Sequence, residues 1–117
     1  MFDVNNYVTR ARISALLGCW DSRLSIDCFR CVKRVAPDGY QTQNDSFVEY
    51  PLNGGYLVFE DESKTRWDLD EETIRRGLSL MPEKATKAWC DFLLEREDAE
   101  TAFVFVQLAL FGKLVYG

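Results

Sequence analysis

The sequence predicts an α+β fold: an N-terminal helix, a small antiparallel sheet of about three strands, and then a three-helix C-terminal half. Three observations predict it. Apolar residues recur at helical spacing near the N-terminus, apolar and charged residues alternate in the middle, and the second half contains several helix start and stop residues. The length of 117 residues is that of one ordinary domain, so we expect a single domain over residues 1–117.

The first expected element is an amphipathic helix over residues 5–17. Tyr7, Ala11 and Ala15 are spaced four residues apart, so they would lie on one face of this helix, to which Leu16 and Leu17 could add before it ends near Gly18. Arg12 is on the opposite side and is expected to face solvent.

Three segments in the middle of the chain are expected to form the sheet. Residues 26–35 alternate roughly between apolar and charged side chains and end at the turn formed by residues 36–39, which includes a proline and a glycine. Residues 56–60 and 65–69 flank a short charged turn, which predicts a hairpin anchored by Trp67.

The C-terminal helices are predicted from their ends. Asp70 is a suitable N-cap because its carboxylate can accept the free backbone N–H of Thr73. Pro82 is expected to open the next helix, since a first-turn proline leaves no extra donor unpaired. Asp98 should cap the last helix, which is apolar nearly all round and should end at Gly112.

The longest expected loop, residues 40–55, is the first candidate for a binding surface. It is polar but carries the aromatic residues Tyr40, Phe47 and Tyr50. Loops of this length are uncommon unless they have a function. The alternative is that the three rings simply plug the core.

The charge of the chain is unevenly distributed. Residues 1–35 hold six basic and three acidic side chains, whereas residues 36–117 hold eight basic and sixteen acidic ones, for a net charge of −5 overall. The second candidate binding surface is an acidic strip that could face a basic partner. It consists of Glu60, Asp61, Glu62, Asp68, Asp70, Glu71 and Glu72. The alternative is that these acids solvate the surface and cap helices.

Residues for the common enzyme chemistries are largely missing from the sequence. The chain contains no histidine, which removes histidine-assisted nucleophiles, and it has no glycine-rich phosphate-binding motif. Cys28 and Cys31 form a C-x-x-C pair, but a zinc site would also need Cys19 and Cys90 to converge on them. We therefore expect packed or free thiols, no metal, no cofactor and no enzymatic activity.

One enzymatic alternative is kept. Pro37-Asp38 followed by Glu62-Ser63-Lys64 matches the PD…ExK pattern of metal-dependent nucleases, in which two carboxylates hold a divalent ion that activates water. Short patterns of this kind also arise by chance, and the charged residues of this one could equally be ordinary turn residues.

Several motifs together resemble a family of small uncharacterised bacteriophage and prophage proteins that end in a DAETADVFLQxALFGExVYG-like tail. The matching segments are residues 37–40, 50–55, 77–78 together with Met81, 98–102, 107–112 and 115–117. Phe103 and Lys113 stand where the family tends to have Asp and Glu, so any site built on those acids would be missing. The resemblance implies a viral origin and a place in the cytoplasm of a bacterial host. It implies no activity for any residue.

The sequence thus leads to the hypothesis of a phage-encoded accessory protein that binds a host protein or protein–nucleic-acid complex stoichiometrically, such as a counter-defence inhibitor of the anti-CRISPR kind. A PD…ExK nuclease and a virion structural or assembly protein are the alternatives. We expect no membrane partner, because the longest apolar run, residues 102–111, is shorter than the roughly 18 residues of a membrane span. Overall acidity argues against direct nucleic-acid binding. The oligomeric state stays open.

Overall fold

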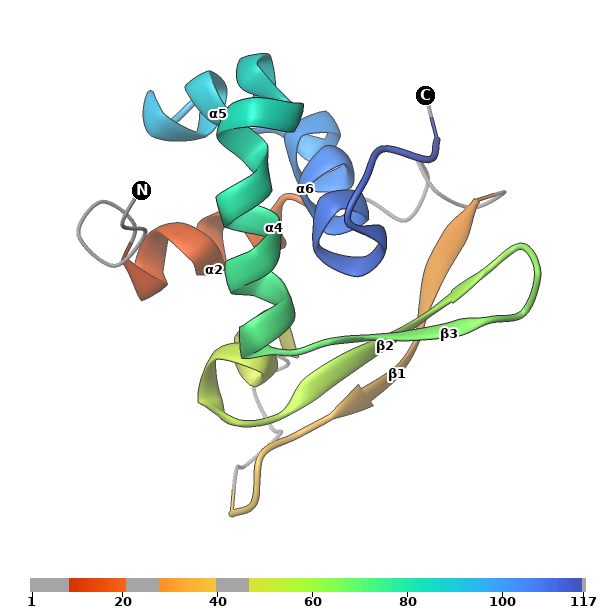
Figure 1. Ribbon diagram of the computed structural model, residues 1–117. Helices are drawn as coiled ribbons and strands as arrows, with labels where there is room; N and C mark the ends of the chain where they lie inside the picture. Colours follow the sequence, from red (N-terminus) through yellow and green to blue (C-terminus); the bar gives the residue numbers. More distant parts are fainter. Residues whose placement is uncertain (1–8, 21–27, 40–46, 117) are drawn as a thin grey trace.

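The structure, a computed structural model, describes residues 9–20, 28–39 and 47–116, and it confirms the predicted α+β class (Figure 1). An N-terminal helix precedes a three-stranded antiparallel sheet, and three helices follow it. The elements in chain order are α2 (Arg10–Gly18), β1 (Phe29–Val35), the 3-10 helix η1 (Phe47–Asn53), β2 (Tyr56–Asp61), β3 (Arg66–Leu69), α4 (Glu71–Lys84), α5 (Thr86–Leu93) and α6 (Ala99–Phe111).

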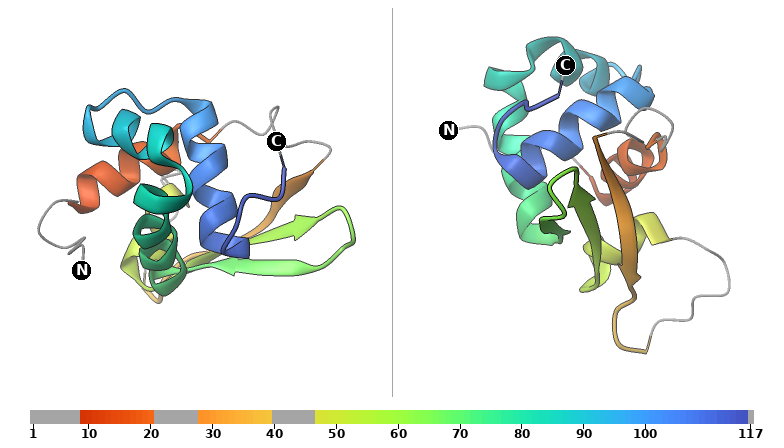
Figure 2. Two further views of the ribbon diagram at one scale, coloured as in Figure 1. Left: turned by 45° about the horizontal axis from the view of Figure 1, so that its top comes forward. Right: turned by 90° about the vertical axis from the view of Figure 1, so that its right-hand side faces the viewer.

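The sheet has the strand order β1-β2-β3, and the helices gather on one of its faces (Figures 1 and 2). Residues that lie directly opposite each other on neighbouring strands point to the same face of the sheet, so the strand register shows which residues lie on each face. Leu57 opposes Leu69, and Phe59 opposes Trp67 on the face that meets the core. The other face carries five charged side chains: Arg30, Lys33, Glu60, Arg66 and Asp68.

Helix α6 is the centre of the core. Nine of its 13 residues are buried, which agrees with a sequence that is apolar nearly all round. Helix α4 crosses it closely at Gly77, where an added Cβ would lie 2.8 Å from the Cβ of Ala109. Arg76, the neighbour of this glycine, donates to the carbonyl oxygens of Ala109 and Leu110 and so ties α4 to the end of α6.

Aromatic rings join the sheet to the helices. Phe29 on β1 stacks on Phe103 of α6 with ring centroids 5.5 Å apart, and Trp20 packs edge-on against Phe59 at 5.4 Å. The ring of Tyr116, from the segment after α6, also stacks on Phe29. Pairs of this kind are worth about 0.5–1.5 kcal/mol beyond their buried area.

The segment after α6 is held by one buried amide. Gln107 is fully buried, and its Oε1 accepts the backbone N–H groups of Val115 (2.8 Å) and Tyr116 (2.7 Å). Its Nε2 donates to the carbonyl oxygen of Tyr116. A single side chain therefore satisfies three backbone groups of the tail, which explains a polar residue in an otherwise apolar helix.

Two predicted helix boundaries are corrected. Thr9 has extended backbone angles and its side chain accepts the N–H of Arg12, so α2 begins at Arg10 rather than at residue 5; residues 5–8 lie outside the described part of the chain. Pro82 does not open a helix but lies within the last turn of α4, which continues to Lys84. The proline is tolerated there because it removes only one backbone hydrogen bond. The helix ends at Ala85, whose backbone angles (φ −147°, ψ 62°) are not helical.

The prediction that Arg12 faces solvent is wrong. Its guanidinium makes a two-pronged ion pair with the carboxylate of Glu97, donates to the carbonyl oxygen of Phe92 at 2.8 Å and lies 5.0 Å from the centre of that ring. Arg12 and Glu97 are 85 residues apart in the sequence, so this ion pair connects α2 to the segment between α5 and α6.

Candidate functional site

The aromatic residues predicted to line a binding loop do not form an exposed surface in the described part of the chain. Tyr40 and the side chain of Phe47 lie outside the described residues. Tyr50 is only 5% exposed and belongs to the hydrophobic core. The Tyr50 ring therefore fills the core, as the alternative expected, and is not part of an exposed aromatic surface. Residues 47–53 form η1 rather than a loop.

The acidic strip is partly neutralised at its first member. Glu60 has a side chain that is only 14% exposed, and three basic groups surround its carboxylate: Arg66 at 3.4 Å, and Arg30 and Lys64 at 3.8 Å each. These bases come from β1, the β2–β3 turn and β3. Since its charge is already compensated, Glu60 offers little attraction to a basic partner.

Other members of the strip have local structural roles. One carboxylate oxygen of Asp61 accepts the N–H groups of Ser63 and Thr65, and the other accepts the indole N–H of Trp67 at 3.0 Å. The Trp67 bond is the main reason why the pKa of Asp61 lies below its ordinary value. Asp70 accepts the N–H of Thr73 at 2.9 Å and so caps α4, as predicted.

The remaining acids of the strip are exposed and lie in three places: the β2–β3 turn, β3 and the first turn of α4. Glu71 pairs with Arg75 one turn along α4 at 3.2 Å. Glu62 lies in the hairpin turn, Asp68 on the outer face of β3, and Glu72 in the first turn of α4. Four of the seven carboxylates therefore already have partners within this chain: Glu60, Asp61, Asp70 and Glu71.

The structure does not bring the PD…ExK residues together. Glu62 and Lys64 follow the end of β2 that pairs with Phe29, whereas Asp38 follows the opposite end of β1, beyond Val35. Six residues of strand separate these ends, a distance of about 20 Å. That is too far for both carboxylates to hold one metal ion.

The four cysteines are also spread over the fold. Cys19 contacts the carbonyl oxygens of Ala15 and Glu97, and Cys90 is exposed on α5. Cys28, just before β1, and Cys31 on β1 both pack against the core. Burial is the main cause that raises the pKa of the Cys19 and Cys31 thiols above the ordinary value. No group of three or more potential metal-binding side chains occurs among the described residues.

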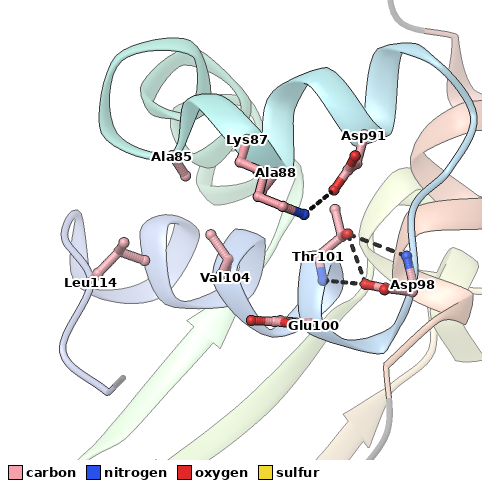
Figure 3. Close-up of a pocket in the computed structure, with 9 residues that line it drawn as sticks. All are labelled: Ala85, Lys87, Ala88, Asp91, Asp98, Glu100, Thr101, Val104 and Leu114. Atoms are coloured by element: carbon pink, nitrogen blue, oxygen red, sulfur yellow. Dashed lines mark hydrogen bonds and ion pairs between the residues drawn. The ribbon is translucent and has the colours of Figure 1, made fainter.

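A groove between α5 and α6 is the best-defined candidate site (Figure 3). Its volume is about 170 Å³. Ala85, Ala88, Val104 and Leu114 provide its apolar surface. Ala88 lies three residues after Ala85, so both short side chains are on the side of α5 that faces α6. Leu114 is 46% exposed, which leaves apolar surface open at one end of the groove.

Charged groups surround this apolar surface. Asp91 on α5 and Asp98 and Glu100 at the start of α6 are acidic, and among the described residues Lys87 is the one basic side chain that lines the groove. The ammonium of Lys87 donates to Asp91 at 3.0 Å. The Asp91 hydrogen bond is the main reason that the pKa of Lys87 is raised, and Glu100 and Asp98 add to it. The groove as a whole has an acidic excess.

Asp98 and Glu100 are positioned by the start of α6. Asp98 accepts the N–H of Thr101 at 3.0 Å, and its own N–H donates to the Thr101 hydroxyl, which completes a capping box. The N–H of Thr101 is also the main reason why the pKa of Asp98 is lowered. The Asp98 carboxylate is therefore ionised at neutral pH, and the Glu100 side chain is exposed in the first turn of α6.

Sequence reasoning identified Asp98 only as a helix cap and did not predict the groove. The spacing of Ala85, the N-cap of α5, and Ala88 within α5 was the available indication, because small residues three apart leave room beside a neighbouring helix. Which helix lies opposite cannot be read from that spacing.

Comparisons of this chain with protein-family models, with curated proteins and with solved structures found no match. The fold and the groove therefore provide the functional argument. No helix in the described part of the chain has the length and hydropathy that a membrane span requires.

Proposed function

We propose that this protein acts by stoichiometric binding to a host macromolecule, as a phage-encoded accessory protein that inhibits a bacterial defence complex. The observation that supports binding most directly is the α5–α6 groove, which combines an apolar surface with an acidic rim. Protein recognition commonly pairs such features, since apolar burial provides affinity and the charges provide specificity. The net charge of −5 favours a partner with a basic surface, such as a nucleic-acid-handling protein.

The proposal is tested in bacteria that carry an active CRISPR–Cas system. Cells with and without this system are infected with a phage that the system targets, in the presence and absence of the protein. We expect the protein to raise plaque numbers at least tenfold in the immune strain only. Equal plaque numbers with a folded, expressed protein would overturn the proposal.

A titration in vitro separates binding from catalysis. Increasing amounts of protein are added to a fixed amount of the purified defence complex, and target cleavage is measured. A stoichiometric binder stops cleavage when the molar ratio reaches a small whole number, whereas an enzyme would inactivate the complex at far lower ratios. Detection of the protein in purified virions, together with no effect on cleavage, would instead support a virion component.

A further inference from the structure

The dimensions of the α5–α6 groove limit what can occupy it. A volume of about 170 Å³ is roughly six times that of a water molecule in the liquid, and it falls below the 300–1,000 Å³ typical of small-molecule pockets. The groove has room for one long side chain but not for a helix or a large cofactor. The groove therefore fits a single side chain inserted by another protein.

The chemistry of the groove matches a basic side chain. Lysine and arginine have an aliphatic stem and a charged head, so they bury the stem on apolar surface while the head stays at the wet rim. Ala88, Val104 and Leu114 would contact the stem, and Asp98 and Glu100 would meet the head. Acidic and wholly apolar side chains each match only part of this surface.

The protein itself places a cation at this rim. The Lys87 ammonium lies beside Asp91, and Figure 3 shows it directed toward the gap between α5 and α6. Its side chain is 92% exposed, so it can swing into solvent at little cost and free Asp91 for another cation. The partial positive charge of the α6 N-terminus opposes a cation, but Asp98 and Glu100 more than offset it.

We infer that the α5–α6 groove receives one lysine or arginine side chain from a basic segment of a partner protein. This inference rests on the proposed binding function and names the chemistry of its partner. The incoming head group exchanges with Lys87 at the carboxylates, and the stem covers Val104 and Ala88.

The test uses blocked pentapeptides of glycine with a single central residue: arginine, lysine, norleucine or glutamate. The full-length protein is titrated with each peptide, and backbone amide shifts are followed by NMR. The arginine and lysine peptides should shift the amides of Ala85, Ala88, Val104 and Leu114 with millimolar affinity that weakens as salt is added. Norleucine and glutamate peptides should leave these amides unchanged.

A matched pair of variants assigns the effect to the groove. Glu100 and Glu72 occupy the same position, two residues after an aspartate N-cap, and both are exposed. Glu100→Gln and Glu72→Gln therefore remove the same charge at equivalent helix positions. Glu100→Gln should weaken binding about two- to fivefold, the range of an exposed ion pair, and Glu72→Gln should not change it. Equal effects of the two variants would overturn the inference.

A second pair tests the exchange with Lys87. Lys87→Ala removes the competing ammonium and should strengthen binding of the arginine peptide, whereas Lys33→Ala, on the outer face of the sheet, should not. Weaker binding by Lys87→Ala would overturn the exchange. Ala88→Met fills the groove and should abolish the amide shifts while leaving the circular dichroism spectrum intact.

These results and the plaque assay can fail separately. If the basic peptides bind but the protein does not protect phage, the proposed function is wrong and the chemistry of the groove stands. If Ala88→Met protects phage as well as the wild-type protein does, the partner binds elsewhere and the groove inference is wrong.

Discussion

Helices α4 and α6 begin in the same way. Each has an aspartate N-cap that accepts the N–H of a threonine three residues later, Asp70 with Thr73 and Asp98 with Thr101. Both have glutamates in the first turn, where negative charge is favourable. The start of a helix is thus set by a few adjacent residues and is readable from the sequence.

The two helices then differ in what surrounds them. Only four of the 14 residues of α4 are buried, whereas nine of the 13 in α6 are. Helix α6 lies among the sheet, α4 and α5, while α4 has one side open to solvent (Figure 1). The comparison teaches that identical helix starts can open helices of very different burial, because burial depends on neighbours distant in sequence.

The largest expected effect tests the contact between these helices. Gly77→Ala places a Cβ within 3.0 Å of the backbone N and Cα of Ala109, which cannot move aside without shifting α6. We expect a loss of about 2 kcal/mol in the free energy of unfolding, even after alanine's better helix propensity is counted. Urea denaturation measures it.

Gly18→Ala is the control for this variant. Gly18 ends α2 and has no atom within 4 Å of an added Cβ, so alanine there should change stability by no more than about 1 kcal/mol, in the stabilising direction. If both variants behaved alike, the close crossing of α4 and α6 would not be a constraint on the fold.

The next effect concerns the ion pair that attaches α2 to the start of α6. The guanidinium of Arg12 is the main cause that lowers the pKa of Glu97, whose side chain is only 9% exposed. A lowered folded-state pKa adds stability that is fully present above the ordinary glutamate value of about 4.3 and is lost as pH falls through the folded value. Glu97→Gln should therefore cost about 1–2 kcal/mol at pH 7 and progressively less below pH 4.

Glu95→Gln is the matched control for Glu97→Gln. Glu95 approaches the same guanidinium at 3.8 Å, but its side chain is 73% exposed. Because solvent screens this pair, Glu95→Gln should leave the free energy of unfolding almost unchanged, both at pH 7 and below pH 4. A pH-independent cost of Glu97→Gln would show that the charge of this carboxylate does not contribute to folding.

Features encoded by neighbouring residues were predictable from the sequence. The Asp70 and Asp98 caps, the hairpin, and Gly112 as the left-handed end of α6 are all confirmed. Each depends on residues that are close along the chain, so local backbone chemistry is sufficient to specify it.

Features built from distant residues were not predictable. The Arg12–Glu97 pair depends on how segments pack, and so does the neutralisation of Glu60 by bases from three segments. The groove likewise needs α5 to lie beside the first turns of α6. Spacing along one helix shows which residues share a face, but it does not identify the element that covers that face.

The smallest expected effect returns to the two helix starts. Asp70→Ala should cost about 1 kcal/mol, the usual value of an N-cap. Asp98→Ala should cost somewhat more, about 1.5 kcal/mol, because it leaves the hydroxyl of Thr101, which is only 3% exposed, without its acceptor. Urea denaturation of the two variants at pH 7 measures the difference.

The asparagine variants of Asp70 and Asp98 are the controls. They keep the acceptor oxygen and should recover most of the loss in both helices. If Asp70→Ala were the more costly, the burial of a helix would not amplify the contribution of its cap, and α6 would owe its stability to packing along its length alone.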